Sequence, residues 1–319
     1  MTSEVKKHLL DIDCYSKEEI LQILNNSKIM MEILNRRVKK VPTLRGKTIV
    51  TLFYEPSTRT RISFEQAGKI LNADVINIAT KESSSNKGES LLNTVLTIQS
   101  IKADIIIIRH PHAGAPYFLA KNSEVPIINA GDGSHAHPTQ SLLDLYTIHN
   151  NSGQIDNLNI VMVGDILYSR VARSNILGLS TLGANITLCG PNTLIPQDFL
   201  HKQHLYKNIT FEHSLKKAVK NADIIMPLRI QLERQSSGHL PNLQEYSKQW
   251  CITNDIVSLA KPSVKILHPG PMNEGIEISS EVAHGSKSLI QEQVTNGVAV
   301  RMAILYSMLN AESKMELER

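Results

Sequence analysis

The chain has 319 residues, of which 41% are hydrophobic and only 4% aromatic, and its formal net charge is +4. This length suits two domains, and the mild charge comes without the basic stripe and interleaved aromatic residues that typify nucleic-acid binding. The longest apolar runs, such as residues 105–108, have the length of a strand and are too short to span a bilayer. We therefore expect neither a nucleic-acid nor a membrane partner.

The three cysteines, Cys14, Cys189 and Cys251, lie far apart and form no C-x-x-C motif. This spacing predicts neither a zinc site nor a disulfide framework, and it favours a reduced, cytoplasmic setting. Residues 1–10 carry charges and have no apolar core, so we expect no signal peptide.

The first half of the chain alternates helical and strand-like patterns. After an expected helix at 16–35, the apolar runs predict strands at 47–54, 74–78, 104–109 and 125–129, with helices at 57–71, 88–101, 115–121 and 138–149. Such alternation predicts a parallel sheet with right-handed crossovers.

A second alternating set follows the polar stretch 150–153, which we interpret as lying just past a domain joint. Its expected strands are 159–164, 185–189, 208–211, 223–227 and 264–267, and its expected helices lie near 169–180, 196–204, 214–221, 252–260 and 288–309. The polar region 235–248 is interpreted as a loop and a candidate lid.

The predicted fold class is α/β, with two doubly wound parallel-sheet domains and an active site in the cleft between them. The first domain would comprise residues 1–149 together with the C-terminal helix 288–310, and the second domain would comprise residues 150–287.

The segment from Glu55 to Arg61, E-P-S-T-R-T-R, is the most informative stretch. It lies where the strand at 47–54 gives way to a helix, so the free N–H groups of that helix would face the turn. The two arginines and three hydroxyl residues in the segment suit a phosphate or another compact anion. An ordinary helix cap with surface arginines is the alternative, but a cap does not need Arg59 and Arg61.

Polar side chains also follow other strands of the first half. Arg109 ends one expected strand, and His137, Thr139 and Gln140 stand where the next gives way to a helix. Each alone fits a surface charge or a helix cap, but ligands of open α/β sheets bind beyond the carboxyl ends of the strands. We therefore expect these residues to converge with the segment at 55–61.

The second half carries a similar set. The turn at 164–170 has one glycine followed by Ile166 and Leu167, which disfavours the close approach of a dinucleotide pyrophosphate. Arg170 would instead point a fork of donors into the cleft. Arg229 and Gln231 could share a face of extended chain, although an exposed charged loop is an equal alternative. The stiff loop at 268–271, H-P-G-P, could offer carbonyl groups to an N–H₂ group.

Taken in order, these motifs resemble the catalytic chains of the aspartate carbamoyltransferase family. The resemblance covers residues from about 45 to 305 and rests on these motifs: S-T-R-T-R (57–61), S-x-x-x-K-G-E (83–89), Arg109, H-P-T-Q (137–140), V-G-D (163–165) with Arg170, R-x-Q-x-E-R (229–234) and H-P-x-P (268–271).

The resemblance implies a transferase that moves the carbamoyl group of carbamoyl phosphate to L-aspartate in pyrimidine synthesis. It implies Thr60, Arg109 and His137 as catalytic donors to the carbonyl oxygen. The implied carbamoyl phosphate site consists of Ser57, Thr58, Arg59, Thr60, Arg109, His137, Gln140 and the loop carbonyls of Pro269 and Gly270, with Pro271 beside them. The implied aspartate site consists of Lys87, Arg170, Arg229 and Gln231.

The family also implies a homotrimer in which a neighbouring subunit supplies Ser83 and Lys87, and it implies no metal and no organic cofactor. It leaves open whether a regulatory chain or a dihydroorotase partner binds. One departure is Glu274, which stands where related sequences often carry arginine after H-P-G-P.

Three other functions compete with this one. An ornithine carbamoyltransferase shares the corner at 57–61, but it uses an H-C-L-P run and an acidic segment where this chain has Pro269-Gly270 and Arg229. A cationic substrate is disfavoured beside Arg229. A non-catalytic scaffold would be expected to lose site arginines, and this chain keeps them. A nicotinamide dehydrogenase would need a glycine-rich turn after Val163, and this chain lacks the glycines there.

Overall fold

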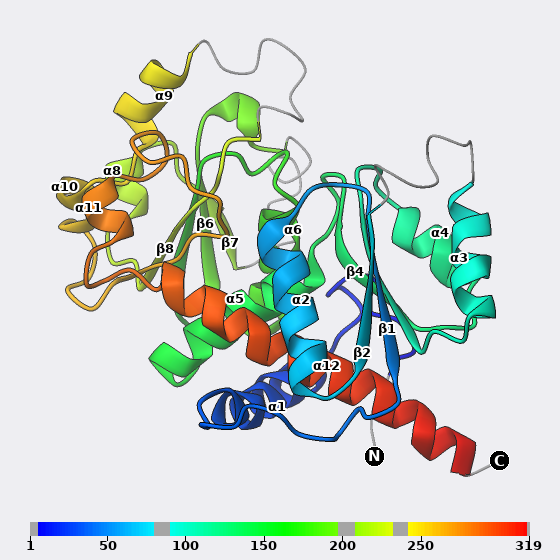
Figure 1. Cartoon of the computed structure of the whole chain (residues 1–319). Helices are drawn as coiled ribbons and strands as arrows, with labels where there is room; N and C mark the ends of the chain where they lie inside the picture. The colour runs from blue at the N-terminus through cyan, green and yellow to red at the C-terminus, as the bar shows by residue number, and fades with distance from the viewer. Residues whose placement is uncertain (1–5, 80–89, 197–207, 232–241, 318–319) are drawn as a thin grey trace. The chain divides into compact units, whose positions relative to one another are not determined.

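The computed structural model describes residues 6–79, 90–196, 208–231 and 242–317, and the chain divides into two compact units. The first unit comprises residues 1–146 and 294–319, and the second comprises residues 147–293. The chain leaves the first unit within helix α5 (Pro138–Ser152) and returns to it within helix α12 (Ile290–Leu317), both labelled in Figure 1.

The first unit is built on a parallel sheet with strand order β2-β1-β3-β4. Its strands are β1 (Thr48–Phe53), β2 (Asp74–Ala79), β3 (Ile105–His110) and β4 (Ile127–Asp132). The four isoleucines at 105–108 are fully buried, so β3 is shielded on both faces, as is usual for a central strand of a parallel sheet. The predicted parallel sheet is therefore confirmed.

Helices cover both faces of this sheet. Helix α2 (Thr58–Ile70) packs closely on one face, because a Cβ atom at Gly68 would lie only 2.6 Å from the Val75 side chain and 3.0 Å from that of Ile49. Helices α3 (Leu91–Ser100) and α4 (Ala115–Lys121) contribute Val95 and Leu119 to the core on the other face. Helix α1 (Lys17–Leu34) begins at a capping box formed by Ser16 and Glu19.

The second unit has a five-stranded parallel sheet with strand order β7-β6-β5-β8-β9. Its strands are β5 (Asn159–Val163), β6 (Asn185–Cys189), β7 (Ile209–Phe211), β8 (Ile224–Pro227) and β9 (Lys265–Ile266). Its helices are α6 (Arg170–Thr181), the 3₁₀ turn η2 (Asn192–Leu194), α8 (Leu215–Ala218), α9 (Leu243–Trp250), α10 (Asn254–Val257) and α11 (Ser280–Ala283).

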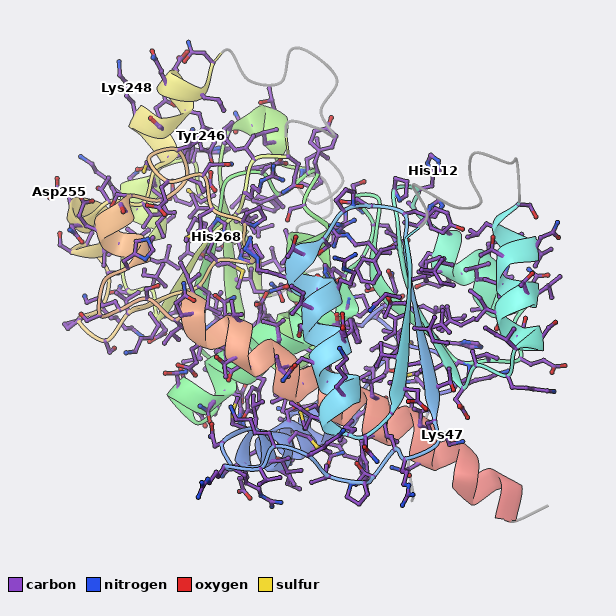
Figure 2. The ribbon with its side chains drawn as sticks, viewed as in Figure 1. Lys47, His112, Tyr246, Lys248, Asp255 and His268 are labelled. Atoms are coloured by element: carbon purple, nitrogen blue, oxygen red, sulfur yellow. The ribbon has the colours of Figure 1, made fainter. Side chains whose placement is uncertain are left out.

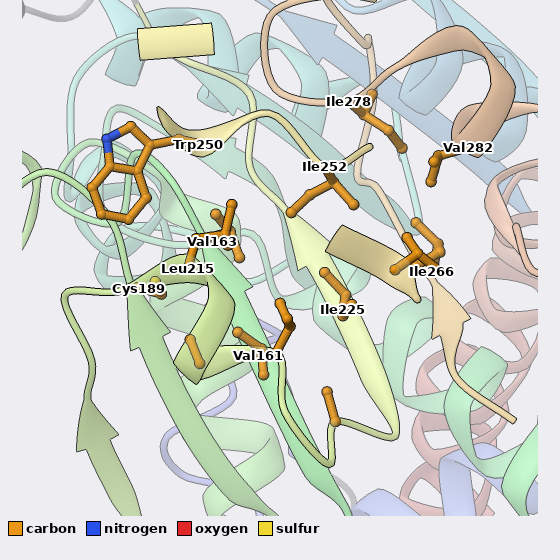
Figure 3. Packing of buried hydrophobic residues seen from close by; sticks show 14 of the residues in the cluster. Val161, Val163, Cys189, Leu215, Ile225, Trp250, Ile252, Ile266, Ile278 and Val282 are labelled. Atoms are coloured by element: carbon orange, nitrogen blue, oxygen red, sulfur yellow. The ribbon is translucent and has the colours of Figure 1, made fainter. Parts of the chain in front are cut away.

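An aliphatic core holds this second sheet to its helices. Figure 3 shows side chains of the core, among them Val161, Ile225 and Ile266 from the strands and Val282 from α11. Trp250, the single tryptophan, lies at the edge of the same core with 9% of its surface exposed. Packing is thus mostly aliphatic, as the low aromatic content predicts.

One predicted loop is wrong where the structure describes it. The region 235–248 was expected to be irregular, but α9 begins at Leu243, and the side chain of Asn242 accepts a hydrogen bond from Glu245 N at 2.7 Å. Tyr246 and Trp250 lie one helical turn apart and are the buried residues of this helix. Residues 235–241 of the candidate lid lie outside the described part of the chain.

Several predicted bounds also differ. Helix α5 continues through the polar stretch 150–152 and stops at Gly153, whose φ of 76° suits glycine. Helices expected at 214–221 and 252–260 are the single turns α8 and α10. The helix expected near 196–204 falls almost wholly on residues that the structure does not describe.

Candidate active site

The anion-binding corner predicted from the sequence lies at the carboxyl end of β1. Ser57 is the N-cap residue of α2 with extended backbone (φ −159°, ψ 97°), yet its side chain makes no capping hydrogen bond. Thr60, in the first turn, is buried, whereas Thr58 and Arg59 are exposed. The first turn of α2 therefore combines helix N–H groups, hydroxyl groups and a guanidinium group, a combination that suits a phosphate.

Arg109 stands beside this corner because β3 pairs with β1 in parallel register, with Phe53 opposite Arg109. Arg109 as a whole residue is 9% exposed. The guanidinium group donates to Glu55 Oε1 at 2.9 Å and to the carbonyl oxygen of Ala130 at 3.3 Å. A buried fork of donors is thus held in place next to the turn that carries Thr60.

A buried aspartate organises the loop between β4 and α5, which leads to His137. Asp132 accepts hydrogen bonds from Ala136 N at 3.1 Å and from Gly114 N at 2.8 Å. Burial alone would raise the pKa of Asp132, but hydrogen bonds from His135, Asn129 and Gly114 outweigh it and lower this pKa. The ionised carboxylate thereby fixes the approach to α5, where His137 and Gln140 are both buried.

A second aspartate links two segments of the second unit. Asp165, which is fully buried, follows β5 and accepts hydrogen bonds from Tyr168 N and Gln231 N, both at 3.0 Å. Gln231 in turn donates from Nε2 to the carbonyl oxygen of Arg229 at 3.1 Å. The turn after β5 and the segment after β8 are therefore joined by one carboxylate.

Arg170 opens helix α6 from this same turn. The hydroxyl group of Ser169 caps the helix by accepting from Ala172 N at 3.2 Å, and Arg170 is only 3% exposed. Gly164, at the start of the turn, has φ 114°, and a Cβ atom there would lie 2.5 Å from the Tyr246 hydroxyl oxygen. Only glycine allows this close packing of α9 against the turn.

The loop after β9 is held by side chains. His268, labelled in Figure 2, is 2% exposed; its backbone N–H donates to Gln293 Oε1 at 2.9 Å, and its Nδ1 accepts from Gly270 N at 2.8 Å. Gly270 has φ 61°. Because Pro269 and Pro271 carry no N–H, the carbonyl groups of the loop become its main polar feature.

The structure thus gathers the predicted residues into two sets. Ser57, Thr58, Arg59, Thr60, Arg109, His137 and Gln140 lie at the carboxyl edge of the first sheet, and Arg170, Arg229, Gln231, Gly270 and Pro271 lie at that of the second. Ser83 and Lys87 lie outside the described residues. The organising role of three acids, Glu55, Asp132 and Asp165, was not predicted from the sequence.

The described part of the chain contains no group of three or more His, Cys, Asp or Glu residues arranged to hold a metal ion. Its cysteines are free thiols. None of its helices is both long enough and apolar enough to cross a membrane.

Two parallel sheets with arginine, histidine and hydroxyl groups at their carboxyl edges define an α/β protein suited to phosphorylated and other anionic ligands. Two family models match nearly the whole chain. Residues 7–150 match the carbamoyl-P binding domain of aspartate/ornithine carbamoyltransferase, and residues 156–308 match its Asp/Orn binding domain. The chain belongs to the aspartate/ornithine carbamoyltransferase family.

Among the members of this family, the similar curated relatives are aspartate carbamoyltransferase catalytic subunits. The aspartate carbamoyltransferase catalytic subunit of Dehalococcoides mccartyi (strain CBDB1) is 52% identical over 94% of this chain and 91% of its own. That of Chloroflexus aurantiacus (strain J-10-fl) is also 52% identical, over 96% and 99%. Both are carbamoyltransferases, as the sequence motifs predicted.

Solved structures share the fold. Aspartate transcarbamoylase from Trypanosoma cruzi, in complex with carbamoyl phosphate and aspartate, has a TM-score of 0.87 and 30% identity, covering 96% of this chain and 97% of its own. Ornithine carbamoyltransferase from Pyrococcus furiosus has a TM-score of 0.85 and 29% identity, covering 97% and 99%. The fold alone therefore does not choose the second substrate.

Proposed function

We propose that this chain transfers the carbamoyl group of carbamoyl phosphate to the amino group of L-aspartate, forming N-carbamoyl-L-aspartate and phosphate, as a step of pyrimidine synthesis. The observation that carries the proposal is the 52% identity to aspartate carbamoyltransferase catalytic subunits over more than nine-tenths of the chain. Arg229 supports the choice of a dicarboxylate, because a cationic amino acid would meet like charge there.

In this proposal the first set of residues handles carbamoyl phosphate. Ser57, Thr58, Arg59 and Thr60 hold the phosphate, and Thr60, Arg109 and His137 donate to the carbonyl oxygen, on which negative charge accumulates. Donors fixed before the reaction stabilise that charge without having to reorganise. The buried, hydrogen-bonded state of Arg109 supports such a role.

The second set handles the amino acid. Arg170, Arg229 and Gln231, with Lys87, bind the two carboxylates of aspartate, and the carbonyl groups of the loop at 268–271 accept from the carbamoyl N–H₂ group. The aspartate nitrogen forms a bond to the carbamoyl carbon, the bond from that carbon to the phosphate oxygen breaks, and the departing phosphate takes the amine proton. His137 then serves as a hydrogen-bond donor.

We also infer a homotrimer with shared sites. The segment that carries Ser83 and Lys87 directly precedes α3. Leu96 on α3, Ile101 just after it and Phe118 on α4 are exposed apolar side chains. Such side chains support burial against a second copy of the chain. The relatives' name, catalytic subunit, supports a search for a regulatory chain or a dihydroorotase partner by co-purification. The free cysteines favour a cytoplasmic location.

A ureido assay on the purified chain tests the function. We expect product from carbamoyl phosphate with aspartate and none with ornithine. Arg229→Gln should lower kcat/KM for aspartate about ten- to a hundredfold, because a charge-assisted contact is lost. The matched control is Arg173→Gln, which removes an exposed arginine of α6. Product with ornithine alone would identify the rival transferase, and inactivity with both would favour the scaffold.

A further inference from the structure

The orientation of the Gln140 side chain is set by a residue one helical turn away. Gln140 Nε2 donates to Asp144 Oδ1 at 3.0 Å, and both residues lie on α5. An amide has a donating end and an accepting end, whereas a carboxylate only accepts. The nitrogen of Gln140 must therefore face Asp144, and its oxygen is the end left to meet a ligand.

Asp144 is fully buried, and its charge acts on Arg301, a cation that is only 3% exposed. Arg301, from α12, donates from one terminal nitrogen to Ser63 Oγ at 2.9 Å and to the carbonyl oxygen of Gly297 at 3.1 Å. Burial lowers the pKa of Arg301 to about 10, and the charge of Asp144 opposes that fall. A buried carboxylate needs such an opposite charge.

This arrangement reaches the phosphate corner. Ser63 and Phe64 belong to α2, whose first turn carries Thr60, and the Arg301 guanidinium group lies 5.1 Å from the centre of the Phe64 ring. Helices α2, α5 and α12 therefore meet at one buried group of charges in the first unit. The side chain that would touch the substrate, Gln140, is the outermost member of this group, with 9% exposure.

A carbamoyl group presents an oxygen that accepts and an N–H₂ group that donates. Thr60, Arg109 and His137 are all donors, so the N–H₂ group needs accepting partners, and the oxygen of Gln140 would join the carbonyl groups of the loop at 268–271 in that role. We propose that Asp144 is a positioning residue: it turns the Gln140 amide so that the oxygen, and not the nitrogen, meets the N–H₂ group of carbamoyl phosphate. This inference rests on the proposed function.

The alternative is that Asp144 only stabilises the fold, through a helical pair and a buried charge pair. The two roles differ in selectivity. If the role is structural, substitution of Asp144 should weaken the binding of all ligands of the site together. If Asp144 positions Gln140, the substitution should weaken the binding only of ligands that carry the N–H₂ group.

The first test compares carbamoyl phosphate with acetyl phosphate, in which a methyl group replaces N–H₂. Asp144→Asn keeps the shape but can donate to Gln140 as well as accept from it. We expect carbamoyl phosphate to bind about tenfold more weakly, the effect of about one lost hydrogen bond, and acetyl phosphate to bind as before. Equal weakening of both ligands would overturn the proposal.

Matched variants keep this test interpretable. Asp104→Asn removes a carboxylate that pairs with Lys47 at 2.8 Å in the same unit, at the amino end of β3, and should change neither affinity. Should the Asp144→Asn chain fail to fold, Asp144→Glu keeps the charge but displaces the carboxylate, and it should show the same selective loss.

A second test asks whether Asp144 acts through Gln140. Gln140→Met removes the amide at similar length. If Asp144 acts only by turning that amide, Asp144→Asn should cause no further loss of kcat/KM in the Gln140→Met chain. A loss as large as in the otherwise unchanged chain would show that the role is structural and would contradict the proposal.

A third measurement does not depend on the reaction. In the full chain with isotope-labelled glutamine, the side-chain amide signal of Gln140 is identified by its absence from Gln140→Met. Its hydrogens should exchange with solvent more slowly in the unchanged chain than in Asp144→Asn. Equal exchange rates would refute the positioning role. Inactivity of the unchanged chain would instead refute the proposed function, and the two failures are thus distinguishable.

Discussion

His268 and Glu277 form a wholly buried pair in the second unit, with 3.3 Å between His268 Nε2 and Glu277 Oε1 and no solvent exposure of either side chain. Because His268 Nδ1 accepts a hydrogen bond from Gly270 N, Nε2 is the ring nitrogen that faces the carboxylate. Glu277 Oε1 also accepts from Asn273 N at 2.6 Å. One carboxylate thus anchors both ends of the loop that begins with His268.

Removing that carboxylate should destabilise the protein. We expect Glu277→Ala to lower the free energy of unfolding by about 1–3 kcal/mol, because the backbone N–H of Asn273 loses its acceptor and the buried His268 ring loses the carboxylate beside it. Glu277→Gln, which keeps one accepting oxygen, should cost less. Urea unfolding measures both, with Glu281→Ala, at an exposed position, as the control. Similar losses for all three variants would contradict the role of the buried pair.

Asp165 should matter for the second substrate. Asparagine at this position can accept with only one of its two polar atoms, so either Tyr168 N or Gln231 N loses its partner. We expect Asp165→Asn to raise KM for aspartate about five- to twentyfold, the effect of a lost buried hydrogen bond, and to change KM for carbamoyl phosphate much less. Steady-state kinetics would show this split, and Asp156→Asn, at an exposed site in the same unit, is the control.

Asp11 should make stability depend on pH. Burial, the largest cause, raises its pKa from 3.8 to about 6. Between these values the folded chain holds a proton that the unfolded chain has released, so stability falls as pH rises through this range. Asp11→Asn should therefore be more stable than the unchanged chain at pH 7.5, by about 1–3 kcal/mol.

The stability advantage of Asp11→Asn should shrink towards pH 4. At that pH Asp11 of the folded chain is protonated and uncharged, like asparagine. Thermal unfolding across this range measures the difference, and Asp74→Asn, at an exposed position, should show no such trend. An advantage of Asp11→Asn that is the same at pH 4 and pH 7.5 would show that ionisation of Asp11 is not its cause.

Shared sites predict complementation between inactive chains. Lys87→Ala and Arg109→Ala should each be inactive alone. After unfolding together and reassembly in equal amounts, a site with Arg109 from one chain and Lys87 from its neighbour should arise in up to about a quarter of cases. The ureido assay should therefore recover up to about a quarter of full activity. Each variant reassembled by itself is the control, and mixtures as inactive as these controls would argue against sites built from two subunits.

Much of the fold could be predicted because hydrophobic periodicity reports burial. The helix at 115–121 and the strand at 185–189 have the predicted bounds, and both sheets are parallel as expected. The polar composition of 235–248 was misleading. Only Tyr246 and Trp250 of α9 are buried, and two apolar residues one turn apart are a weak signal of helical periodicity.

The candidate site was predictable in its donors and not in its acids. Arginine, histidine and hydroxyl residues stand next to strand ends, so their place along the chain indicates their place in the sheet. The partners of Glu55 and Asp165 cannot be found in this way, because they come from other strands. Glu55 meets Arg109 across two neighbouring strands, and Asp165 meets Gln231 across two others.

By itself, the order of residues determined the class of fold, the alternation of strands and helices, and the family motifs, since each depends on short-range spacing. Only the folded chain decided which distant residues meet: Glu55 holds Arg109, Asp165 holds Gln231, and Arg301 lies near Asp144. The physical reason is that such pairs require strand register and helix packing to bring distant residues within hydrogen-bond reach, and no local pattern in a chain encodes that distance.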